Sequence, residues 1–150
     1  MKSQTPTASE IMTQGVYTLS PDTPVTQAAT MMLKRGFSGA PVVGTDNEVV
    51  GIFSERDCMD VLASTAWNDR PEGTVSDMMS TDVFSIAPET DLFQLVTLFH
   101  TQPHRRLPVV EENRLVGMIT RRDVMRALQA VEQTGASSKK RYTMWEMPPR

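Results

Sequence analysis

The chain has 150 residues, 39% hydrophobic and 22% charged, an ordinary composition for one globular domain or two small halves. Its net charge of −3 argues against a general nucleic-acid binder, and no apolar run reaches the roughly 18 residues of a membrane helix. Cys58 is the only cysteine, so no internal disulfide can form. Because residues 1–10 also lack an apolar secretion signal, we expect a reducing, cytoplasmic environment.

The charge is unevenly distributed. Residues 1–100 carry five basic and thirteen acidic side chains, whereas residues 101–150 carry ten basic and five acidic ones. A basic second part in an acidic chain predicts either a local anion site or an adhesive tail. Two histidines and one cysteine match no standard metal-site spacing, so we predict no metal.

The first half predicts five elements in order. Residues 16–19 are β-branched and aromatic and stop at Pro21, which indicates a short strand. Apolar residues at 25, 28, 29 and 32 have helical spacing, and Gly36 should end that helix. Short strands follow over 40–43 and 49–53, with a turn at 45–47 between them, and a second helix begins after residue 54.

The second half repeats the first. A shift of 67 residues places APVV (40–43) on LPVV (107–110). After one extra loop residue in the first copy, a shift of 66 places VVGIFSERDCM (49–59) on LVGMITRRDVM (115–125). The sequence therefore predicts an α+β fold of two β-α-β-β-α repeats over 8–66 and 74–133, with a linker over 67–73 and a tail over 134–150. We expect Gly135 to cap the last helix. Neither repeat can bury much core alone, so the two should pack together.

Each repeat carries a S/T-x-x-D pattern where a strand meets a helix, at Ser54–Asp57 and at Thr120–Asp123. One interpretation is a helix cap, in which the hydroxyl accepts a bond from the first helical turn. The other is a ribose site, because an ionised carboxylate only accepts hydrogen bonds and so suits a vicinal diol. The two interpretations are compatible.

The duplicated hPVV and G-h-h-S/T-x-x-D motifs, in which h is a hydrophobic residue, resemble those of the cystathionine-β-synthase (CBS) domain. Two such domains in tandem resemble a Bateman module. The resemblance covers roughly residues 8–133. It implies a pseudo-twofold module with two clefts between the repeats, which bind adenosine-containing ligands. It also implies homodimers, and regulatory proteins that sense ligands and are not enzymes.

The resemblance further implies which residues share a cleft. The first cleft would combine Ser54, Asp57 and Arg56 with an adenine pocket at Ile52, Val83 and His104. The second cleft would combine Thr120, Asp123 and Arg122 with an adenine pocket at Met118, Val16, Phe37 and Ser38. For most of the apolar residues, plain core packing is the competing interpretation.

Arginines supply the expected phosphate contacts. The resemblance assigns this role first to Arg106 and Arg122, then to Arg105, with Arg56 and Arg121 as further candidates. A solvated basic surface is the alternative for each one. The first repeat has GFSGA (36–40) where the second has PHRRL (103–107), so the two clefts should differ in affinity.

No catalytic constellation emerges. Cys58 lies on the apolar face of a predicted helix, which favours a buried, inert thiol. His100 has no serine or aspartate spaced to form a triad, and the chain has neither G-x-G-x-x-G nor a P-loop.

We therefore predict a non-enzymatic regulatory module that requires no cofactor and binds AMP, ADP or ATP, in preference to NAD or S-adenosylmethionine. Its expected partners are a second copy of itself and an unidentified client protein, with no nucleic acid and no membrane. The alternative is a structural interaction module with vestigial clefts, acting through its dimer surface and the tail around Trp145.

Overall fold

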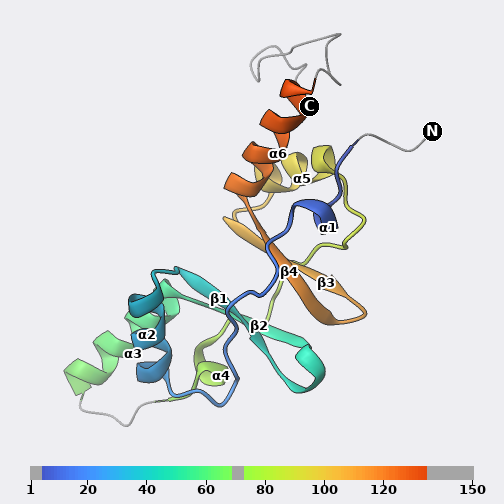
Figure 1. Ribbon diagram of the computed structural model, residues 1–150. Helices are drawn as coiled ribbons and strands as arrows, with labels where there is room; N and C mark the ends of the chain where they lie inside the picture. Colours follow the sequence, from blue (N-terminus) through green and yellow to red (C-terminus); the bar gives the residue numbers. More distant parts are fainter. Residues whose placement is uncertain (1–4, 69–72, 135–150) are drawn as a thin grey trace.

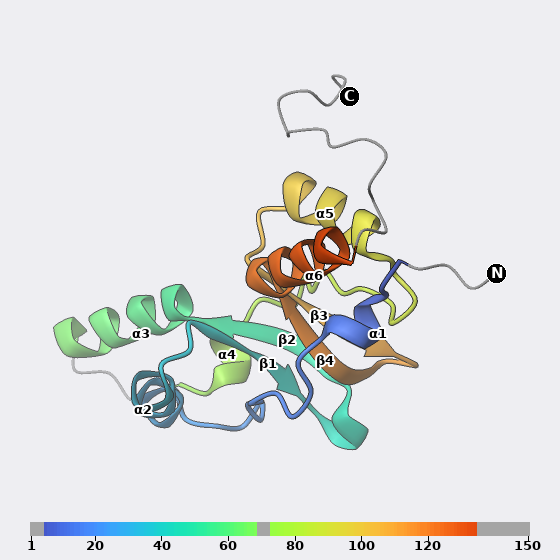
Figure 2. The same ribbon diagram turned by 45° about the horizontal axis from the view of Figure 1, so that its top comes forward.

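The computed structural model describes residues 5–68 and 73–134. Two similar halves, each a helix pair on a two-stranded hairpin, form the molecule (Figures 1 and 2). The first half comprises α2 (Val25–Arg35), β1 (Gly39–Val43), the short helix η1 (Thr45–Asn47), β2 (Val49–Ser54) and α3 (Glu55–Asn68). The second comprises α5 (Leu92–Thr101), β3 (Arg106–Glu111), β4 (Arg114–Thr120) and α6 (Arg121–Gln133). Two four-residue helices, α1 (Ala8–Ile11) and α4 (Val75–Met78), precede the halves.

The two hairpins are built in the same register. Gly39 pairs with Ser54 in the first, and Arg106 pairs with Thr120 in the second. Each hairpin also changes register at the same place, after Val42 and after Val109. The internal repeat of the sequence is therefore a repeat of structure, and the predicted α+β class is confirmed.

In place of the expected first strand, each repeat has a single isolated β-bridge. Leu19 bridges Val42, and Ile86 bridges Val109, both in parallel. The Leu19 N–H donates to the carbonyl of Pro41 at 3.0 Å, and the Leu19 carbonyl accepts from the Val43 N–H at 2.9 Å. A proline follows two residues after each bridge and lacks the N–H that a longer ladder needs, so the strand stops there.

The helices follow the predicted spacing. Val25, Ala28, Ala29 and Met32 are the buried residues of α2, and Gly36 ends that helix with a φ of 72° in the left-handed region. The third helix continues through Trp67 and Asn68, which the sequence analysis had assigned to the linker. No proline or glycine interrupts the chain before Pro71, so nothing in the sequence stops the helix earlier. The predicted cap Gly135 and the tail after it lie outside the described residues.

Each half has its own core, and each core is completed by a segment that precedes the other half. Ala8 of α1 is fully buried in the core around Leu92, Leu95 and Ile119. Val75 of α4 is fully buried in the core of the first half. The Ala8 N–H donates to the Thr90 carbonyl at 2.7 Å. This exchange of entry segments joins the halves into one body.

Two glycines allow the entry segments to approach the hairpins. A Cβ on Gly51 would lie 2.9 Å from the carbonyl oxygen of Ser80, and one on Gly117 would lie 3.0 Å from that of Thr13. At these places the Ile52 N–H donates to the Ser80 carbonyl and the Met118 N–H to the Thr13 carbonyl, at 2.9 and 3.0 Å. The glycine of each G-h-h-S/T-x-x-D motif therefore makes room for the neighbouring backbone.

Candidate functional site

Both S/T-x-x-D motifs form reciprocal caps. Oδ2 of Asp57 accepts from the backbone N–H of Ser54 at 2.9 Å and from its hydroxyl at 3.0 Å. Oδ2 of Asp123 accepts the same two bonds from Thr120, at 2.8 and 3.1 Å. One carboxylate oxygen in each repeat therefore fixes the start of a helix, and the other is left to make further contacts.

The second oxygen differs between the repeats. Oδ1 of Asp123 accepts from the Arg126 guanidinium at 3.1 Å. The equivalent of Arg126 in the first repeat is Asp60, and within the described residues no protein donor reaches Oδ1 of Asp57. A ribose diol can therefore use this oxygen of Asp57 directly, whereas at Asp123 it must share the oxygen with an arginine.

The first cleft, a cavity of about 240 Å³, lies between the repeats at the end of β2. The first repeat contributes Ile52 and Ser54 to its wall. The second contributes the apolar Val83 and Phe84 and the nitrogen-bearing side chains of His104, Arg105 and Arg106. Asp82 also lines it, so the cleft carries one carboxylate beside its two arginines.

The second cleft has a similar size, about 280 Å³, and a different lining. Met118, Thr120 and Asp123 come from the second repeat, and Val16 and Tyr17 from the first. Of the arginines within residues 5–68 and 73–134, only Arg106 lines it.

Arg106 lines both clefts and joins the repeats. Its guanidinium donates to the Gly39 carbonyl at 2.9 Å and to the hydroxyl of Ser38. Burial lowers the pKa of Arg106 from its ordinary value, with Glu55 acting in the opposite direction. These bonds use two of the five N–H donors of the guanidinium, and the others are left for further contacts.

An aromatic pair stands beside each cleft at equivalent positions. Phe84 and His104 stack with ring centroids 6.1 Å apart, and Tyr17 and Phe37 are 5.1 Å apart and tilted. The Arg35 guanidinium lies 4.6 Å from the centroid of the Tyr17 ring. These rings give each cleft an apolar edge suited to a flat base.

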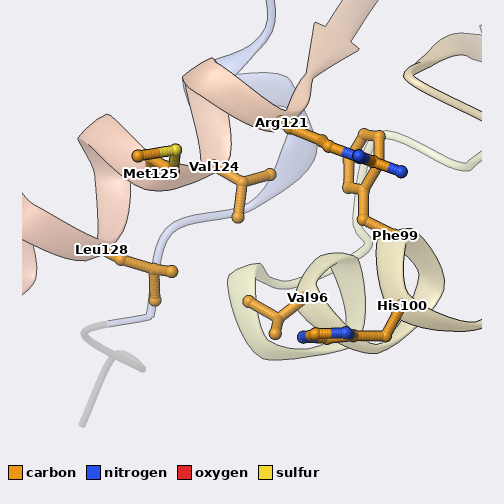
Figure 3. Close-up of a pocket in the computed structure, with 7 residues that line it drawn as sticks. All are labelled: Val96, Phe99, His100, Arg121, Val124, Met125 and Leu128. Carbon is orange, nitrogen blue, oxygen red and sulfur yellow. The ribbon is translucent and has the colours of Figure 1, made fainter. Parts of the chain in front are cut away.

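The structure does not bring every predicted site residue into a cleft. Asp57 does not line the first cleft, whereas its repeat equivalent, Asp123, lines the second. Ser38 lines the first cleft rather than the second, and Phe37 faces a hollow between α2 and α3. Arg122 lines a surface groove along α6, and Arg121 faces a hollow between α5 and α6 (Figure 3). Arg56 is exposed at the start of α3 and lines neither cleft. The phosphate contacts predicted for these three arginines stay predictions.

The sequence analysis missed several cleft residues, among them Phe84, Tyr17 and Asp82. Tyr17 and Phe84 directly follow Val16 and Val83, which were selected, and they occupy equivalent repeat positions. That equivalence of two aromatic residues was the available signal.

Two hollows beside α6 are larger than the clefts, at about 460 Å³ between α5 and α6 and about 710 Å³ along α6. Neither is lined by the hydroxyl residue or the aspartate of a S/T-x-x-D motif. Cys58 is buried, as predicted, and burial together with Asp57 and Glu55 raises the pKa of its thiol. Within residues 5–68 and 73–134, no three metal-ligating side chains cluster, and no helix is long and apolar enough to span a membrane.

Comparison with known proteins agrees with this architecture. The CBS domain model matches twice, over residues 8–64 and 75–130. The chain therefore belongs to the CBS domain family, as a tandem pair.

Relatives include enzymes and small proteins. The chain is 34% identical over 116 residues to inosine-5'-monophosphate dehydrogenase of Thermoplasma acidophilum. The matched segment makes up 77% of the chain but only 22% of that enzyme. It is 30% identical to the CBS domain-containing protein YhcV of Bacillus subtilis, over 85% of the chain and 89% of that protein. The crystal structure of CBSX2 in complex with AMP superposes with a TM-score of 0.74 and 25% identity, over 85% and 98% of the two chains.

Proposed function

We propose that this protein is a non-catalytic regulatory module that binds an adenine nucleotide between its CBS repeats, chiefly in the first cleft. The observation that carries the proposal is that cleft's combination of groups. Phe84 and Ile52 offer an apolar wall, and Arg105 and Arg106 offer donors to phosphate. Asp57 does not itself line this cleft, but it is bonded to Ser54, which does, and we propose that its Oδ1 reaches the ribose diol.

A phosphate-bearing ligand fits this chemistry better than S-adenosylmethionine does. Arg105 is exposed at the mouth of the first cleft, where a flexible guanidinium can reach an anion. The AMP complex of CBSX2 supports the same ligand class. We therefore propose AMP, ADP or ATP as the ligand.

Regulation would follow from linkage. A nucleotide that contacts both repeats binds best at one angle between them, so it shifts the module toward that arrangement. We propose that a homodimer and a client protein respond to this shift. The competing function, a structural interaction module with vestigial clefts, predicts that nucleotide has no effect.

Calorimetric titration with AMP, ADP, ATP, NAD and S-adenosylmethionine tests the proposal. We expect an adenine nucleotide to bind, and Asp57→Ala to weaken it by about a hundredfold or more, because about two charge-assisted bonds to the ribose are lost. Asp123→Ala should have a smaller effect on the same ligand.

A matched control separates ribose binding from helix capping. Oδ2 of Asp77 accepts from Thr74 N–H at 2.9 Å and from its hydroxyl at 3.1 Å, which is the same cap. Thr74 lines neither cleft, whereas Ser54, the cap partner of Asp57, lines the first. Asp77→Ala should therefore leave affinity unchanged. No binding by the folded wild-type protein, or equal losses in Asp57→Ala and Asp77→Ala, would contradict the proposed function.

A further inference from the structure

Arg35 stands beside the second cleft, although the sequence analysis did not select it. Its guanidinium carbon lies 4.6 Å from the centroid of the Tyr17 ring, and Tyr17 lines that cleft. The cation therefore rests against a ring that forms part of the cleft wall.

The end of α2 carries Arg35 to this ring. Gly36 follows with a φ of 72°, and its N–H donates to the Met32 carbonyl at 2.9 Å. This left-handed turn ends the helix and brings the ring centroid of Phe37 to 5.1 Å from that of Tyr17. A helix C-terminus favours any cation, which accounts for a basic residue at this position. The contact with Tyr17 is what keeps Arg35 beside the cleft.

Arg35 keeps its hydrogen-bonding capacity for a ligand. It is exposed, and within residues 5–68 and 73–134 its side chain forms neither a hydrogen bond nor an ion pair. Arg126 differs, because it already pairs with Asp123 at 3.1 Å. A cation–π contact at an exposed site is weak and involves the face of the guanidinium, so all five N–H donors of Arg35 are left to bind a phosphate.

The two clefts differ in where a guanidinium of their own comes from. Arg106 lines both clefts, so a nucleotide in each would have to share it. The first cleft also has Arg105, whose repeat equivalent is Ser38. Three residues earlier the exchange is reversed, because the second cleft has Arg35 beside it and the repeat equivalent of Arg35 is Gln102. Each repeat therefore places one further arginine next to a cleft, from a different position.

We propose that the second cleft also binds an adenine nucleotide and that Arg35 holds its phosphate, with the Tyr17 ring positioning the guanidinium. The inference rests on the proposed function, which places nucleotide chiefly in the first cleft, and adds to it a second anion site. The second site is the weaker one, because Asp123 shares Oδ1 with Arg126.

Removal of the charge in two backgrounds tests this assignment. Asp57→Ala leaves the second cleft intact, and Asp123→Ala leaves the first. In the Asp57→Ala background we expect Arg35→Gln, which copies Gln102, to weaken ADP binding by about tenfold, because a charge-assisted contact is lost. Adenosine, which has no phosphate, should bind unchanged. In the Asp123→Ala background, Arg35→Gln should leave ADP affinity unchanged. Calorimetric titration measures all of these affinities.

Lys34→Gln is the matched control, since it removes the same charge from the exposed neighbour of Arg35 on α2. It should leave ADP affinity unchanged in both backgrounds.

Two variants of Tyr17 test the positioning role of its ring. Tyr17→Phe keeps the aromatic face, so in the Asp57→Ala background it should keep the preference for ADP over adenosine. Tyr17→Leu keeps an apolar wall but has no such face, so it should lower that preference towards the one seen with Arg35→Gln. The ratio of the two affinities separates the loss of the cation–π contact from a loss of contact with the base.

Three outcomes would overturn the inference. They are a folded Asp57→Ala variant that binds no ADP at millimolar concentration, equal losses of ADP and adenosine affinity in Arg35→Gln, and equal losses of ADP affinity in the two backgrounds. Each leaves the proposed function standing, because that function is judged by the wild-type protein and its first cleft. A folded wild-type protein that binds no nucleotide would remove both.

Discussion

The two repeats share a hairpin register and an aspartate that caps a helix, yet the first and second clefts present different chemistry to a ligand. His104 and Arg105 line the first cleft, whereas the residues at the equivalent repeat positions, Phe37 and Ser38, do not line the second. The second aspartate is further occupied by Arg126. Duplication has therefore kept the backbone that builds a site, while substitution at a few side chains has separated what the two sites can bind.

The largest effect should come from replacing two residues of the first cleft by those at the equivalent positions of the first repeat. We expect His104→Phe with Arg105→Ser to weaken ADP binding by about a hundredfold, since charge-assisted contacts to phosphate are lost, and to change adenosine binding little. Titration with both ligands measures this. An equal loss for ADP and adenosine would show that these residues support the fold rather than the phosphates.

Replacement of the two motif glycines tests what the clefts share. Gly51→Ala and Gly117→Ala should each destabilise the protein by about 1–3 kcal/mol in urea unfolding, because the added methyl group meets a backbone carbonyl of an entry segment.

Gly44 supplies the control for that pair. A Cβ there would have an ordinary contact at 3.5 Å with Val50, so Gly44→Ala should stay within about 0.5 kcal/mol. A large loss of stability on replacing only one of the two motif glycines would show that the repeats are not equivalent at this position.

Arg106 belongs to both clefts, so its replacement should reveal how the repeats are joined. Arg106→Met removes the bonds to Ser38 and to the Gly39 carbonyl, and we expect it to cost about 1–3 kcal/mol of stability. Arg105→Met, an exposed neighbour, should cost less than about 0.5 kcal/mol. Equal stability of the two variants would show that Arg106 does not stabilise the contact between the repeats.

The smallest effect should be at Arg126. Its side chain is 71% exposed, so Arg126→Ala should change stability by less than about 0.5 kcal/mol. Because it frees an oxygen of Asp123, it should strengthen whatever ligand binding the Asp57→Ala variant retains. A weaker residual affinity would show instead that Arg126 contacts the ligand.

Much of the fold could be predicted because its signals are local and occur twice. Helical spacing over Val25–Met32, the stop at Gly36 and the strand pair around Pro41 all rest on short-range patterns, and the structure confirms them. The S/T-x-x-D positions were likewise visible in the sequence.

Features that depend on the relative placement of the repeats could not be predicted in this way. Nothing local in TASEIM (7–12) shows that Ala8 completes the core of the second half. Similarly, Arg106 was selected for phosphate, but its bonds to Ser38 and Gly39 exist only because the repeats pack together. Arg121 and Arg122 adjoin a cleft residue in sequence, yet the turn of α6 carries them to other surfaces.

A crystal structure of the protein grown with ADP would test the central claim most directly. The account predicts a nucleotide in the first cleft, with its ribose hydroxyls on Asp57, its base beside Phe84 and its phosphates at Arg105. A nucleotide held instead by Asp123 in the second cleft, with the first cleft free of ligand, would contradict it.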